Sequence, residues 1–104
     1  MSIVVEQQGD TVVMRIAGIF GYRMHADFMR AVRGAQKGAA CVIDLINTDH
    51  IDSAGMGMLL MMREMFGGDA ARITLINPNP KVHGVLVTAQ FQELFKIAYG
   101  YKGS

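Results

Sequence analysis

Residues 52–57, which read Asp-Ser-Ala-Gly-Met-Gly, carry the hydroxyl group of this chain that is best placed for chemistry. They follow an apolar run at residues 41–45 and begin a long apolar stretch at residues 54–66, an order that predicts strand, loop and helix. Ser53 should then lie at a helix N-terminus, where free backbone N–H groups and the helix dipole favour an anion. Ser53 is therefore either an N-cap, for which it is well suited, or a site where phosphorylation would change binding.

Other catalytic arrangements are absent or incomplete. Two glycines at this segment lack the third glycine of a dinucleotide fingerprint, and no phosphate-binding loop with Gly-Lys-Ser/Thr occurs. His25, His50 and His83 lack the spacing of metal ligands. A hydrolase using Ser53 and His50 would need a sharp nucleophile turn and a third member, and neither is evident. We therefore expect no catalytic residue, no metal and no cofactor.

The length of the chain predicts one domain over residues 1–104. The chain has a formal net charge of +1 and no basic run, which argues against nucleic acid as a direct partner. Its start has no basic signal region, and the apolar run at residues 54–62 is far too short for a membrane span. Cys41 lies in an apolar strand and should be a buried, inert thiol. These features predict a cytoplasmic protein.

The hydrophobic pattern predicts an α/β fold. A hairpin is expected from residues 3–7 and 11–17, strands at 40–45 and 72–76, and helices at 24–35, 53–66, 80–87 and 91–98. A strand, helix and strand across residues 40–76 imply a right-handed crossover between parallel strands. The hairpin makes the sheet mixed, with four to five strands and about four helices packed against it.

The helix after Ser53 has more apolar surface than one core contact needs. At 100° per residue, the face assigned to the core contains Gly55, Met58, Leu59, Met62, Met65 and Phe66. The opposite face contains Met56, Gly57, Leu60, Met61, Arg63 and Glu64. For Leu60 alone, the favoured explanation is that another element of the fold covers it. Methionines are adaptable contact residues, however, and a helical glycine facing outward is costly, so the surface of Met56, Gly57 and Met61 predicts a partner interface.

Two motifs carry a family resemblance. Residues 42–45, Val-Ile-Asp-Leu, and residues 51–60, Ile-Asp-Ser-Ala-Gly-Met-Gly-Met-Leu-Leu, resemble the STAS domain of bacterial anti-sigma factor antagonists. The resemblance extends over nearly the whole chain, including Gly18, residues 73–75 and residues 91–97. It implies a mixed sheet with helices packed against it, in agreement with the pattern above.

The resemblance also implies a phosphorylation switch. In the family, the serine that matches Ser53 is phosphorylated by an anti-sigma factor that is a serine kinase, and a metal-dependent serine/threonine phosphatase reverses the modification. The unphosphorylated antagonist binds the kinase and frees the sigma factor. By this resemblance, Ser53 would be the phosphorylated residue of this chain. The implied partner-binding surface comprises Asp52, Ser53, Ala54, Gly55, Met56, Gly57, Leu60 and Met61.

Further residues bear on that surface. Gly21 stands where the family commonly has an acidic residue, so Tyr22, Arg23 and His25 are assigned to docking instead. Asp44, at a strand end, either shapes the phosphorylation site or binds loop amides.

Two other functions remain open from the sequence. One is a non-phosphorylated STAS subunit of a larger assembly, such as a lipid-transport complex at the inner membrane. The other is a small nucleotide-binding or hydrolytic enzyme, which no motif supports.

Overall fold

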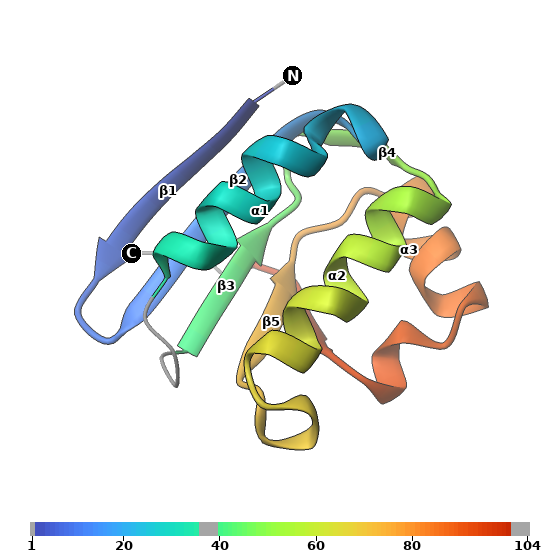
Figure 1. Ribbon diagram of the computed structural model, residues 1–104. Coiled ribbons are helices and arrows are strands. Elements are labelled where there is room, and N and C mark those ends of the chain that lie inside the picture. Colours follow the sequence, from blue (N-terminus) through green and yellow to red (C-terminus); the bar gives the residue numbers. More distant parts are fainter. Residues whose placement is uncertain (1, 36–39, 101–104) are drawn as a thin grey trace.

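The structure, a computed structural model, describes residues 2–35 and 40–100 as a mixed sheet covered by helices (Figure 1). The strands are β1 (Ser2–Gln8), β2 (Thr11–Phe20), β3 (Ala40–Asp44), β4 (Thr48–Ile51), β5 (Ile73–Ile76) and β6 (Lys96–Ala98). The α-helices are α1 (His25–Gly34), α2 (Ser53–Met65) and α3 (Pro80–Thr88). Short 3₁₀ turns are η1 (Tyr22–Met24), η2 (Gly68–Ala70) and η3 (Phe91–Glu93).

The sheet has the strand order β1-β2-β3-β5-β6. β1 and β2 form the predicted antiparallel hairpin, while β2, β3, β5 and β6 run parallel to one another. β2 is long enough to serve two partners, because its first half pairs with β3 and its last residues pair with β4. Gly18 is the first residue of β2 that pairs with β4, and the register of this pair shifts directly after it. Its φ of 92° is a conformation that favours glycine. The predicted mixed α/β sheet is confirmed.

All three helices pack on one face of the sheet. Side chains alternate between the two faces of a strand, so Val12, Met14 and Ile16 of β2 point toward the helices. They share one buried cluster with apolar residues of α1, α2 and α3. On the other face, Val13, Val42 and Ile76 form a small second cluster, and no described helix packs there.

Two of the sequence-based assignments were wrong. The last segment is not a helix over 91–98 but the turn η3 followed by strand β6. Phe91 and Phe95 are buried in a stacked pair with ring centroids 5.4 Å apart, and the chain then extends beside β5. The loop before α2 also contains a strand, β4, anchored by a 2.7 Å hydrogen bond from the Thr48 hydroxyl to the carbonyl of Ile16. The sheet therefore has six strands, with three α-helices in the described residues.

Candidate functional site at the N-terminus of helix α2

Asp52, not Ser53, is the N-cap of α2. Its backbone is extended, and its Oδ1 accepts a 2.9 Å hydrogen bond from the backbone N–H of Gly55. Ser53 is the first helical residue, so the expectation that Ser53 caps the helix was wrong. Both residue types are good caps, but a carboxylate also gains from the positive end of the helix dipole.

The Ser53 hydroxyl is therefore not needed to start the helix. The side chain is exposed, and it makes no hydrogen bond to any described residue. The backbone N–H groups of the first turn lie next to it, which is the environment that favours added negative charge. An exposed hydroxyl in that position is accessible to another protein.

Two glycines bring the end of β2 against this helix terminus. A Cβ at Gly55 would collide with the carbonyl oxygen of Phe20, and a Cβ at Gly21 would collide with the carboxylate of Asp52. The N–H of Asp52 also donates to the Phe20 carbonyl over 3.3 Å. Gly55 therefore serves close helix–sheet packing, as expected, and Gly21 leaves space for the capping carboxylate. An acidic side chain at position 21 would displace that carboxylate.

A shallow hollow of about 280 Å³ lies beside Asp52. Its wall includes Ile19 and Tyr22, whose side chains are 53% and 68% exposed. The Arg23 guanidinium lies 5.8 Å from the centre of the Tyr22 ring and also lines the hollow. Tyr22 is thus close to the Ser53 segment, which its predicted place in the docking surface requires. Arg23 was expected beside Tyr22, whereas Ile19 was missed, although an apolar residue two positions before Gly21 at the strand end was a usable signal.

The outer face of α2 continues this surface. Gly57 is exposed, and a Cβ there would meet nothing within 4 Å. Leu60 and Met61 are each 39% exposed, so Leu60 is not fully covered by another element of the fold. Met56 is half-buried.

The remaining predicted positions differ in burial. Ala54 is half-buried and His25 is exposed at the start of α1, while Gly55 is buried. Met65, assigned to the core from its helical phase, is the last residue of α2 and is 39% exposed, so that assignment was wrong.

Asp44 lies away from this surface. Cys41 and Ile43 of β3 point to the helices, so the alternation places Asp44 on the helix-free face. Its Oδ1 accepts a 3.0 Å hydrogen bond from the N–H of Ile46, and its Oδ2 lies 3.8 Å from Nε of Arg15. Asp44 thus has the second role foreseen for it, binding a loop amide.

Groups suited to catalysis are sparse in the described part of the chain. It contains no cluster of three or more potential metal ligands, and the ring of His83 packs against Tyr99. His50 Nδ1 is buried without a hydrogen-bond partner. Burial raises the pKa of the Cys41 thiol to about 12, which makes it inert at neutral pH. Each helix within residues 2–35 and 40–100 is too short or too polar to cross a membrane.

Comparisons with known proteins agree with this architecture. A curated relative, a STAS-domain containing protein of Pseudomonas aeruginosa, is 38% identical over 91 residues, covering 86% of this chain and 90% of the relative. An anti-sigma factor antagonist from Mycobacterium paratuberculosis has a TM-score of 0.82 at 17% identity, covering 97% of this chain and 86% of that one.

The anti-sigma factor antagonist SpoIIAA has also been solved in two forms. Its unphosphorylated form gives a TM-score of 0.75 at 21% identity, covering 97% of this chain and 90% of that one. Its phosphorylated form, from Bacillus, gives 0.69 at 20% identity, covering 97% and 93%. These likenesses show a common fold. Residues 3–96 match the family model described as MlaB, STAS domain, and the chain therefore belongs to the STAS domain family.

Proposed function

We propose that this protein is an anti-sigma factor antagonist whose binding is switched by phosphorylation of Ser53. The observation that carries the proposal is the separation of roles at the start of α2, where Asp52 caps the helix and Ser53 presents an exposed hydroxyl. A fold neighbour of similar length, SpoIIAA, has been solved in phosphorylated and unphosphorylated forms, which supports a switch of this kind in the present chain. The proposed role is binding, with no catalysis assigned to the chain. The protein would act in the bacterial cytoplasm.

The proposed partner is a kinase-type anti-sigma factor, and a serine/threonine phosphatase would restore the free serine. The partner would contact the outer face of α2, formed by exposed Ser53, Gly57, Leu60 and Met61 and half-buried Met56. Tyr22 would form the rim of this contact surface, next to Ile19 and Arg23 in the adjoining hollow. Large, adaptable apolar side chains next to an aromatic residue are typical of interface centres.

Phosphorylation would oppose binding without unfolding the domain. A phosphate adds nearly two negative charges next to the Asp52 carboxylate and near exposed Asp49. The helix N-terminus stabilises this charge locally, since Asp52 continues to cap the helix. The same charge would stand in the middle of an apolar contact surface, where its desolvation is costly.

The first experiment is phosphosite mapping of the protein from its native cells, together with identification of the proteins that co-purify. We expect phosphate on Ser53 and a kinase-type anti-sigma factor. Binding of that partner should be retained by Ser53→Ala and lost, by at least about tenfold in Kd, by Ser53→Asp. Equal binding by both variants would reject the switch.

A consistently unmodified Ser53 with a co-purifying transporter would favour the alternative of a structural STAS subunit. Tight binding of ATP or GTP by the isolated domain would instead point to an enzyme.

A further inference from the structure

Strand β1 forms one edge of the sheet, and only one of its two sides is paired. Its seven residues align with β2 without a shift in register, from Ser2 opposite Ala17 to Gln8 opposite Thr11. No other strand within residues 2–35 and 40–100 pairs with β1, and Figure 1 shows it at the outside of the fold. An unprotected edge strand of this length is a template for pairing with another strand.

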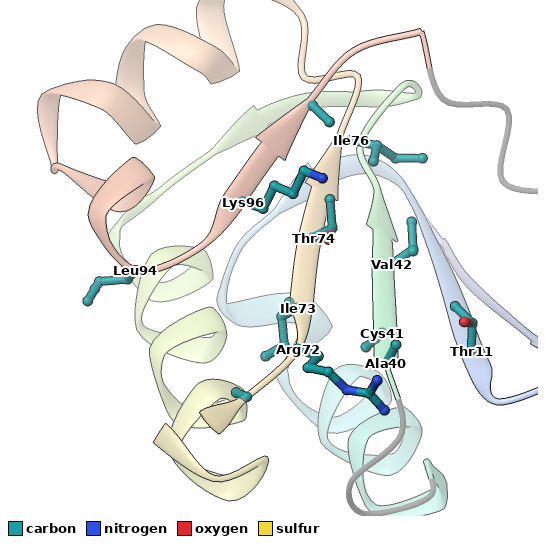
Figure 2. Close-up of a pocket in the computed structure, with 12 residues that line it drawn as sticks. Thr11, Ala40, Cys41, Val42, Arg72, Ile73, Thr74, Ile76, Leu94 and Lys96 are labelled. Carbon is teal, nitrogen blue, oxygen red and sulfur yellow. The ribbon is translucent and has the colours of Figure 1, made fainter. Parts of the chain in front are cut away.

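The usual protections of a sheet edge are missing from β1. It contains no lysine, proline or bulge, and Glu6 is its one charged residue. Glu6 already has a partner within the chain, because its Oε1 lies 2.7 Å from Nη1 of Arg15. The opposite edge differs, since β6 has three residues and begins with Lys96, whose side chain Figure 2 shows extending toward Thr74 of β5. A short strand with a lysine resists pairing, and β1 has neither protection.

β1 also exposes apolar side chains on both faces of the sheet. Val5 is 46% exposed and lies opposite Met14, so it projects to the helix-covered face together with half-buried Ile3. Val4 is 52% exposed and projects to the helix-free face. Beside Ile3 and Val5, a hollow of about 570 Å³ lies between β1 and α1, and its wall includes Ala31. A strand added at this edge would remove apolar surface from water on both faces.

The hairpin determines which backbone groups of β1 face outward. Along an antiparallel pair, successive residues alternate between bonding to the partner strand and pointing away from it. Gln8 and Thr11 flank the two-residue turn and therefore form a hydrogen-bonded pair. Counting back by twos from Gln8, the even-numbered residues bond to β2. This leaves the N–H and C=O groups of Ile3, Val5 and Gln7 on the open side.

One register of β1 with a second copy of itself matches these groups and side chains. In an antiparallel pair with its two-fold axis at Val4, Ile3 lies opposite Val5 of the second copy, and both present outward backbone groups. The two Val4 side chains then face each other on the helix-free side, and Ser2 faces Glu6. Apolar residues meet apolar residues, and the acidic side chain meets a hydroxyl rather than a like charge. With the axis at Val5 instead, Val4 would face the charged Glu6.

We propose that the outer edge of β1 is a self-association surface, at which two copies pair antiparallel around Val4 and their sheets become continuous. The contact is small, because an edge strand and its flanking side chains bury less than the roughly 1,600 Å² of a standard interface. We therefore expect a weak dimer, with a Kd on the order of 100 μM. The residues of this edge are separate from those assigned to the Ser53 surface, so each copy would keep that surface open.

The first test is sedimentation equilibrium of the purified chain from about 10 μM to about 1 mM, where we expect a change from mostly monomer to mostly dimer. Val4→Lys places two ammonium groups opposite each other and should raise the Kd at least about tenfold, as should Val4→Glu with two carboxylates. An equimolar mixture of the two variants should dimerise again, because opposite charges then meet. The matched control is Val87→Lys on α3, at a side chain that is 39% exposed, and it should dimerise as the unmodified protein does.

A disulfide tests the register of the pair. Facing residues of a non-hydrogen-bonded antiparallel pair have Cα atoms about 4.5 Å apart, within the range that a disulfide spans. Val4→Cys should therefore give a covalent dimer on mild oxidation. Val5→Cys, which would face Ile3, and Val87→Cys should each give at least about fivefold less. Cys41 is buried and does not compete.

Four outcomes would each overturn the proposal. They are a chain that stays monomeric at about 1 mM, undiminished dimerisation of Val4→Lys, no dimer in the mixture of the lysine and glutamate variants, and stronger cross-linking at position 5 than at position 4. None of these measurements involves phosphorylation or an anti-sigma factor, so they are independent of the function proposed for the Ser53 surface.

Discussion

The two faces of helix α2 have similar composition and different surroundings. Both carry methionine and glycine, yet Met62 is fully buried while Met61, its neighbour, is 39% exposed. Gly55 is needed because the Phe20 carbonyl lies where its side chain would be, whereas the corresponding space at Gly57 is empty. Composition alone therefore does not distinguish packing from recognition. The distinction comes from what each position touches.

Replacement of the two methionines should give the largest difference between the faces. Met62→Ala removes a fully buried side chain and should lower the free energy of unfolding by about 3 kcal/mol. Met61→Ala should lower it by less than about 1 kcal/mol, since much of the side chain is already in water. Urea unfolding followed by circular dichroism measures both values. Similar losses for the two variants would mean that the outer face is packed rather than available to a partner.

Replacing Gly55 and replacing Gly57 with alanine should change the stability of the domain in opposite directions. Gly55→Ala places a methyl group against the backbone of β2 and should destabilise the domain by about 2 kcal/mol. Gly57→Ala adds a methyl group in open space and removes a glycine from a helix interior, so it should stabilise the domain by up to about 1 kcal/mol. Thermal unfolding of the two variants provides the comparison.

The same pair tests the proposed interface. If a partner approaches the helix backbone at Gly57, the more stable Gly57→Ala protein should bind that partner more weakly. Full binding by this variant would remove position 57 from the proposed contact surface.

The sequence predicted the larger elements because their hydrophobic patterns extend over enough residues. The hairpin and helix α2 had enough residues for period 2 or 3.6 to be distinguished, and β3 and β5 were recognised as short, continuous apolar runs. β6 has three residues and β4 has four, and over such lengths the two periods fit equally well. Tertiary contacts decide those segments, chiefly the buried Phe91 and Phe95 before β6.

The start of helix α2 was predicted to within one residue, and that residue matters. Asp52 and Ser53 are adjacent and both cap helices well, so pattern alone could not fix which one starts α2. The packing of Gly21 against the Asp52 carboxylate fixes the position of Asp52.

The smallest difference in the free energy of unfolding is expected between replacement of Asp52 and replacement of Ser53. Asp52→Ala removes the oxygen that accepts the Gly55 N–H and should lower the free energy of unfolding by about 1 kcal/mol. Ser53→Ala should leave it unchanged within about 0.5 kcal/mol, because no described residue depends on its hydroxyl and alanine is a good helix former. Urea unfolding of both variants in one buffer resolves the difference. A loss for Ser53→Ala equal to that for Asp52→Ala would give the hydroxyl a structural role. Phosphorylation could then disturb the fold as well as the interface, and a switch confined to the contact surface would no longer follow.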